Sequence, residues 1–254
     1  MFDWFTGKGE TGGVGLEKMR TEFGQMLDAG RHAFDTAANA FLGGTDVEVI
    51  RQDLFKTDKR INRAERRIRR QIVVHASVHS AAQFPACLVL MSIVKDAERL
   101  GDYGKNLFDL AELAPRPPQG EHRDALVRLK DRISDSMAAC REAFDANDKD
   151  AATELIVEAK QIEDLCDERV RGLVRGAPPD AMAPAYVLAY RYFKRVSSHV
   201  RNVASSVVQP LHKLDFTSKI TSEDAAREEP PQKETPQKET SQKEAGQKDA
   251  TQKE

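Results

Sequence analysis

The chain contains two related stretches that lie 96 residues apart: Asp96-Ala-Glu-Arg-Leu-Gly-Asp-Tyr-Gly-Lys-Asn106 and Tyr192-Phe-Lys-Arg-Val-Ser-Ser-His-Val-Arg-Asn202. Their alignment pairs Arg99 with Arg195, Leu100 with Val196 and Asn106 with Asn202. Each stretch belongs to a segment that begins near a proline and follows two longer segments of apolar periodicity. Because the order of segments and breaks repeats along with these residues, the sequence predicts one three-helix unit used twice.

Six segments carry apolar residues at steps of three and four, which is the pattern of amphipathic helices. The predicted helices cover residues 16–42, 46–75, 85–114, 123–147, 150–175 and 184–208. Gly43-Gly44, Pro115-Arg-Pro-Pro and Gly176-Ala-Pro-Pro separate them, and Thr45 with Glu48 predicts a capping box for the second helix. The predicted fold class is therefore all-α, with two tandem three-helix bundles in a six-helix arrangement and a disordered tail.

The predicted organisation has four parts. A flexible N-terminus covers residues 1–15, the two repeats cover 16–118 and 119–215, and a low-complexity tail covers 216–254. The tail repeats Pro-Gln-Lys-Glu-Thr with a period of five residues and is almost free of apolar side chains. Such a segment buries too little surface to offset its ordering entropy, so we expect it to be disordered.

Composition argues against several classes of protein. The net charge of the chain is −2. Residues 223–254 have nine acidic and six basic residues and so contribute −3, which leaves the rest of the chain at +1. A nearly neutral body gives no electrostatic argument for binding nucleic acid. The cysteines lie far apart in apolar helical positions, which predicts core residues in a reducing compartment: Cys87, Cys140 and Cys166. No signal peptide is expected, because no basic run precedes an apolar stretch at the start.

A membrane span is not expected either. The stretch Gln71 to Val94 has no charged residue, but it contains two histidines and Pro85, and its dense apolar part is Ala86 to Met91. A span needs about 20 apolar residues.

The third predicted helix carries a row of polar side chains. Glu98, Asp102 and Asn106 are spaced by four residues, so they lie in one row at the border of the packed face. Asp58 and Glu65 are seven residues apart on the preceding helix and share one side of it. Carboxylates on facing helices are how helical bundles hold metals. The alternative is a solvated row that forms ion pairs with Lys95, Arg99 or Lys105.

The second predicted helix is strongly basic. Between residues 59 and 70 its cations are Lys59, Arg60, Arg63, Arg66, Arg67, Arg69 and Arg70. Two interpretations stay open, a solvated face or a docking surface for an acidic partner or a phosphate-bearing group. Nucleic acid is disfavoured, because no aromatic residues are interleaved and no recognition motif is present.

The stretch 96–106 resembles the signature helix of the PhoU family, which reads Leu-Glu-Arg-Ile-Gly-Asp with an asparagine four residues on. Asp58-Lys-Arg-Ile-Asn-Arg-Ala-Glu65 is similar to the preceding helix of that family, and residues 194–202 resemble its second copy. The similarity covers about residues 16–208. It implies two tandem three-helix bundles and a cytoplasmic regulator of phosphate uptake and phosphate-responsive signalling that acts by protein contact.

The resemblance also implies a metal site. Members of the family bind multinuclear iron or zinc clusters through Glu/Asp-xxx-Asp pairs, and the matching residues of this chain are Glu98 and Asp102, joined by Asp58 and Glu65. In the second copy Lys194 and Ser198 stand where the acidic pair belongs, so no second cluster is expected, because a cation repels a metal and a hydroxyl is a poor substitute ligand.

The implied partner is a phosphate transporter component or a phosphate-sensing kinase. A homodimer is considered, and membrane association is expected only through a partner. The rival hypothesis is a structural helical adaptor without a phosphate role. A di-metal carboxylate enzyme is disfavoured, because such bundles use Glu-x-x-His pairs and the sequence has none. We therefore expect no catalytic activity.

Overall fold

The computed structural model describes residues 13–78, 81–176 and 180–215, so the predictions for residues 1–12 and 216–254 lie outside the described residues. The described chain forms six α-helices, and two short 3-10 turns, η1 (Ala81–Gln83) and η2 (Leu211–Lys213), follow α2 and α6. The helices are α1 (Gly13–Phe41), α2 (Val47–Val78), α3 (Phe84–Leu113), α4 (Gly120–Ala146), α5 (Lys149–Arg175) and α6 (Ala183–Val208). No strand occurs in these ranges, and the predicted all-α class is confirmed.

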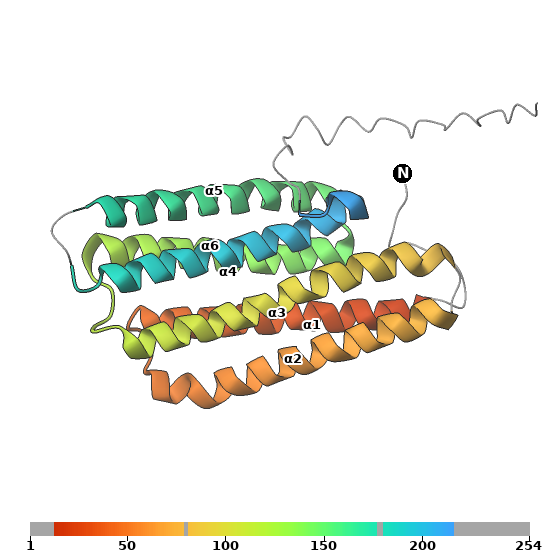
Figure 1. Cartoon of the computed structure of the whole chain (residues 1–254), viewed down its shortest axis with the longest axis horizontal. Helices are drawn as coiled ribbons and strands as arrows, with labels where there is room; N and C mark the ends of the chain where they lie inside the picture. Colours follow the sequence, from red (N-terminus) through yellow and green to blue (C-terminus); the bar gives the residue numbers. More distant parts are fainter. Residues whose placement is uncertain (1–12, 79–80, 177–179, 216–254) are drawn as a thin grey trace, which may run out of the picture.

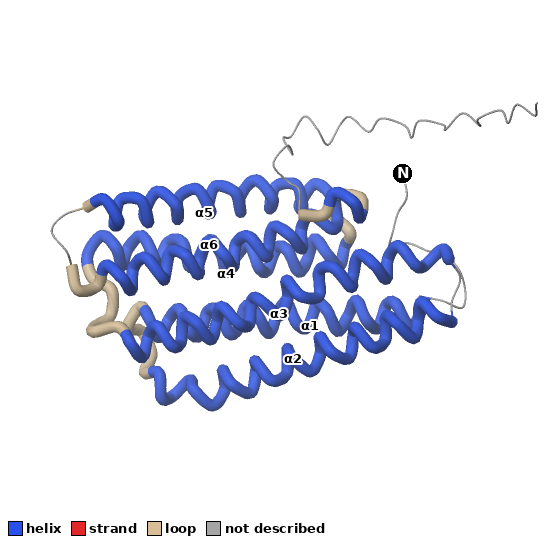
Figure 2. The backbone as a smooth tube through the Cα atoms, viewed as in Figure 1, coloured by secondary structure: helices blue, strands red, loops and turns tan. Residues whose placement is uncertain are grey.

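The helices form two three-helix groups that lie against each other (Figure 1). Helices α1, α2 and α3 pack on one another, and α6 packs on both α4 and α5 in the second group. The groups meet where α3 packs on α6 and α1 packs on α4. Figure 2 shows that all six helices run roughly along one direction, with the short links at the two ends. The polar residues predicted for the first group lie on α2 and α3, so their geometry depends on how these two helices pack.

One apolar core runs through both groups. The rings of Phe23 on α1 and Phe144 on α4 lie 4.8 Å apart, and those of Phe34 on α1 and Phe193 on α6 lie 5.3 Å apart. Aromatic pairs of this kind stabilise a core beyond the area that they bury. Because the described halves share this core, the division at residues 118 and 119 stays a prediction about sequence repeats.

Small residues bring α1 and α3 close together. A Cβ atom added at Gly104 on α3 would lie 2.9 Å from Cβ of Ala33, and one added at Gly30 on α1 would lie 2.8 Å from Cβ of Leu100. Real Cβ atoms do not approach so closely, so these glycines set the spacing between the two helices. That spacing determines how the polar edge of α3 meets α2.

The helix ends follow local chemistry with one correction. The predicted cap Thr45 is wrong, because Oδ1 of Asp46 accepts the backbone hydrogen bond of Glu48 at 2.8 Å. The Glu48 carboxylate pairs instead with Arg51. Helix α2 also continues past His75 to Val78, since the His75 ring lies against Gly15 and pairs with Gln83. Nowhere in the described ranges is a helix both long and apolar enough to cross a membrane.

Candidate functional site

The predicted row on α3 exists, but its members differ in burial. Glu98 is buried, whereas Asp102 and Asn106 are half-buried. Glu98 Oε2 lies 2.6 Å from Lys95 Nζ, and Nη1 of Arg99 donates to Asp102 Oδ2 at 2.9 Å. Each carboxylate of the row therefore holds a cation from its own helix, one turn earlier.

The structure brings Glu65 of α2 and Glu98 of α3 to the same ammonium group. Lys95 Nζ lies 3.9 Å from Glu65 Oε1 and 2.6 Å from Glu98 Oε2, and Arg69 lies 3.1 Å from the same Glu65 oxygen. Both carboxylate oxygens are buried and lack a hydrogen-bond partner of good geometry among the described residues. Two buried carboxylates with unused lone pairs form a site for a cation, which Lys95 supplies.

The other two predicted ligands lie apart from this pair. Asp58 is buried on α2 and has Lys105 Nζ 3.5 Å from its Oδ1, and Asp102 pairs with Arg99. Within the described ranges, no three His, Cys, Asp or Glu side chains gather closely enough to hold a metal ion. In the structure these carboxylates pair with lysine and arginine side chains. A metal at these residues stays a prediction.

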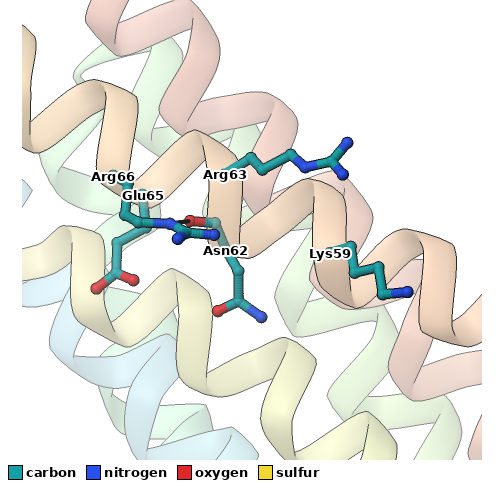
Figure 3. Close-up of a pocket in the computed structure, with 5 residues that line it drawn as sticks. All are labelled: Lys59, Asn62, Arg63, Glu65 and Arg66. Atoms are coloured by element: carbon teal, nitrogen blue, oxygen red, sulfur yellow. Dashed lines mark hydrogen bonds between the residues drawn. The ribbon is translucent and has the colours of Figure 1, made fainter.

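A surface depression adjoins the site on α2 (Figure 3). Its volume is about 500 Å³, and its lining residues are Lys59, Asn62, Arg63, Glu65 and Arg66. In Figure 3 Lys59 and Arg63 point away from Glu65, whose carboxylate extends toward α3. Nε of Arg66 donates to the carbonyl of Asn62 at 3.1 Å. The depression is thus lined by three cations and by one carboxylate, Glu65, which also lies near Lys95.

Comparison with known proteins finds a family match in the first half of the chain. Residues 23–111 match the family model of the PhoU domain. This segment is similar to the PhoU domain. The resemblance predicted from the sequence is thereby confirmed, and the matched segment contains Asp58, Glu65, Glu98 and Asp102. No curated protein sequence matches the chain.

Two solved structures share the fold. PhoU from Pseudomonas aeruginosa has a TM-score of 0.66 at 21% identity, covering 77% of this chain and 96% of that one. The phosphate transport system regulatory protein PhoU from Streptococcus pneumoniae has a TM-score of 0.63 at 17% identity, covering 81% of this chain and 97% of that one. Both coverages exceed the segment 23–111, so the PhoU fold includes the second helical group.

Where the first group has the acidic residues Glu98 and Asp102 on α3, the second group has a cation on α6 that pairs with a carboxylate on α5. Lys194, which aligns with Glu98, donates from Nζ to Asp167 Oδ2 of α5 at 2.5 Å. Arg191, which aligns with Lys95, lies 3.8 Å from the other oxygen of Asp167. The charge on α6 is thus positive and its partner on α5 is negative. The expectation of no second cluster remains a prediction, and Asp167 is a residue that the sequence reasoning missed.

A second cluster joins the first group to the second. Nδ1 of His199 lies 2.8 Å from Oδ1 of Asp96, and Asn202 donates to the same oxygen at 2.9 Å. Burial raises the pKa of Asp215, and the nearby Asp96 carboxylate raises it further. Sequence reasoning did not single out Asp96, although it begins the repeated stretch. The sequence signal that could have found Asp96 is its position two residues before Glu98, which places it on another side of the helix from the Glu98 row.

The cysteines behave as core residues, as predicted. All three are buried and free. Burial raises the pKa of Cys140 and of Cys166 to about 12, and it also raises the pKa of Cys87. At neutral pH they are protonated thiols, whereas thiolates are the nucleophiles and metal ligands.

Proposed function

We propose that this protein regulates phosphate uptake and phosphate-responsive signalling in the cytoplasm, by contact with other proteins. The observation that carries the proposal is the PhoU domain match over residues 23–111. The fold of two solved PhoU proteins, one of them titled a phosphate transport system regulatory protein, supports it over most of the chain.

The proposed partner is a phosphate transporter component or a phosphate-sensing kinase. We assign no catalytic activity to the chain. That assignment is supported by the described chemistry, in which the thiols carry raised pKa values and the buried carboxylates are engaged by cations. The polar groups of the described helices form ion pairs between helices or lie on the protein surface. This arrangement suits a protein that acts by binding other proteins.

The metal is the finer part of this proposal. Glu98 and Asp102, with Asp58 and Glu65, would hold iron or zinc, which would cross-link α2 and α3 in place of the lysine and arginine cations. Metal content of the purified protein is measured for the native sequence and for Glu98→Ala/Asp102→Ala. Metal in the native protein and its loss in the variant would support the site. Equal content in both would remove the metal claim and leave the regulatory role standing.

Deletion of the gene tests the regulatory role. We expect phosphate uptake in phosphate-rich medium to escape control in the deletion strain, and the full chain supplied in trans should restore it. Uptake that is unchanged by the deletion would sink the proposal. A variant that disrupts the fold, such as Phe23→Asp in the shared core, serves as the negative control for complementation.

A structural adaptor without a phosphate role is the second candidate. The observation that favours it is the loss of the acidic pair from the second group, where Lys194 pairs with Asp167. Cross-linking in living cells distinguishes the two. Recovery of a phosphate transporter component or its sensor kinase supports regulation, whereas recovery of unrelated structural proteins alone supports the adaptor.

A further inference from the structure

The outer side of α2 carries a continuous row of exposed cations. They recur at steps of three and four, so they share one side of the helix, and we call them the α2 cation face: Lys56, Lys59, Arg60, Arg63, Arg66, Arg67 and Arg70. Between residues 59 and 78 the sequence offers one carboxylate, Glu65, which is buried and turned toward Lys95. The face therefore has a strong positive charge of its own.

Most of this charge is not compensated by the described residues. Within those residues Arg67 pairs with Glu22, but no carboxylate lies in ion-pair range of Lys59, Arg63 or Arg70. Like charges at i, i+3 and i, i+4 destabilise a helix. An external anion that spans several turns would remove this repulsion.

The same side of the helix ends in exposed apolar side chains. Val73, Val74 and Val78, which we call the valine end, are 60%, 58% and 70% exposed. Phe84 is 49% exposed, and it follows Gln83, which pairs with His75 of α2. Neighbouring apolar side chains left in water cost free energy, and such clusters mark sites of association with proteins or membranes.

We propose that this side of α2 docks directly on an anionic phospholipid bilayer, with the cation face on the headgroups and the valine end in the interface. A bilayer offers phosphate charge and apolar chains side by side, which matches the order of charges and valines along α2. Clusters of four to eight basic residues are typical of surfaces that bind anionic lipid. A bare phosphate polymer would leave the valine end uncovered. Single-stranded nucleic acid binds by base stacking on aromatic rings, and the face has none.

This inference departs from the expectation that a membrane is reached only through a partner. It does not rest on the proposed function, because lipid binding by purified protein is measured without any partner. A transport regulator that sits on the bilayer would meet a membrane transporter by diffusion in two dimensions. The two proposals therefore fit together but fail separately.

Vesicle co-sedimentation with the purified full chain tests the proposal. We expect binding to vesicles that contain phosphatidylglycerol, little binding to phosphatidylcholine alone, and weakening as salt rises, because salt screens exposed charges. Arg63→Glu/Arg66→Glu/Arg70→Glu should weaken binding by at least about tenfold. Val73→Ser/Val74→Ser/Val78→Ser should weaken it less and leave its salt dependence intact.

Matched variants on the second group provide the controls. Arg128→Glu/Arg171→Glu/Arg175→Glu changes three exposed cations by the same charge, and Val174→Ser removes a valine that is 72% exposed. Both should bind like the native protein. Equal weakening by the two arginine triples would show a net-charge effect and overturn the docking face. Native binding by Val73→Ser/Val74→Ser/Val78→Ser would overturn insertion of the valine end, and equal binding to uncharged vesicles would overturn the whole proposal.

Inorganic polyphosphate serves as a competitor. We expect it to displace the protein from vesicles only at phosphate concentrations above those of the lipid. Tighter binding to polyphosphate than to the vesicles, with no contribution from the valine end, would assign the face to a phosphate polymer instead.

Discussion

The ring of Tyr103 on α3 stacks on the ring of His199 on α6, with ring centroids 5.7 Å apart and an interplanar angle of 30°. These two residues are separated by 96 positions, the offset of the two repeated stretches. Equivalent residues of the two repeats therefore touch each other at the contact between the helical groups. This is the arrangement expected where a local twofold axis relates two copies of one unit.

The same offset exposes how the copies have diverged. Asp96 is equivalent to Tyr192, so the Asp96–His199 pair has Tyr192–Tyr103 as its counterpart, with ring centroids 6.0 Å apart. One side of the axis is held by a hydrogen-bonded acid and the other by two aromatic rings. The interface is thus symmetric in backbone and asymmetric in chemistry.

Asp96→Ala should destabilise the protein by about 1–3 kcal/mol, because His199 and Asn202 lose the oxygen that both contact in a largely buried place. Urea unfolding at neutral pH measures the change. The matched control is Asp53→Ala, which removes the exposed pair of Asp53 with His32. Loss of this exposed pair should cost at most about 1 kcal/mol. Equal costs for the two variants would contradict a structural role for the buried pair.

Gly104→Ala should destabilise the protein by about 1–3 kcal/mol, since its Cβ would press on Cβ and the backbone of Ala33. On α5, Gly172 has no atom within 4 Å of an added Cβ, so Gly172→Ala should stabilise by about 0.5–1 kcal/mol. Thermal unfolding of both variants gives the comparison. If Gly104→Ala were as stable as Gly172→Ala, the close approach of α1 and α3 would be wrong.

A charge swap tests the ion pair of the second group. Lys194→Glu places a carboxylate against Asp167 and should cost about 1–2 kcal/mol, because both side chains are partly buried. The double variant Lys194→Glu/Asp167→Lys restores opposite charges and should recover most of the loss. A double-mutant cycle from chemical denaturation measures the coupling. Additive losses in the double variant would refute this pairing.

Stability should fall as the pH rises above about 8.5. The pKa of Cys140 and of Cys166 is raised to about 12 by burial, so an unfolded thiol releases its proton at a lower pH than a folded one. The stabilising contribution is fully present below the unfolded pKa and is lost as pH rises toward the folded pKa. Urea unfolding at pH 7 and pH 10 measures the loss of unfolding free energy between the two pH values. The variant Cys140→Ala/Cys166→Ala should lose less stability over this range than the native protein. An equal loss of stability in that variant would rule out the thiols as the source of the pH dependence.

The fold could be predicted from the sequence because apolar spacing and chain breaks are local signals. The sequence predicted helix starts at residues 16 and 123, whereas α1 and α4 begin at Gly13 and Gly120. The apolar pattern does not mark these starts, because the first turn of a helix lies in solvent and need not contain an apolar residue. The extension of α2 to Val78 depends on contacts of His75 with α1 and η1, which no local pattern reveals.

The site was less accessible to sequence reasoning. Spacing placed Asp58 and Glu65 on one side of the helix that precedes Glu98, and in the structure Glu65 and Glu98 lie near one ammonium group. The identity of that group was not predicted, because the choice among Lys95, Arg99 and Lys105 depends on the crossing of α2 and α3. Asp96 was missed because its partner His199 lies 103 residues away in the chain.

The most direct measurement of the central claim is a phosphate-starvation reporter in a gene-deletion strain grown in phosphate-rich medium. We predict that the reporter is switched on without the protein and is switched off when the full chain is supplied. A reporter that stays off in the deletion strain would contradict a regulatory role in phosphate signalling.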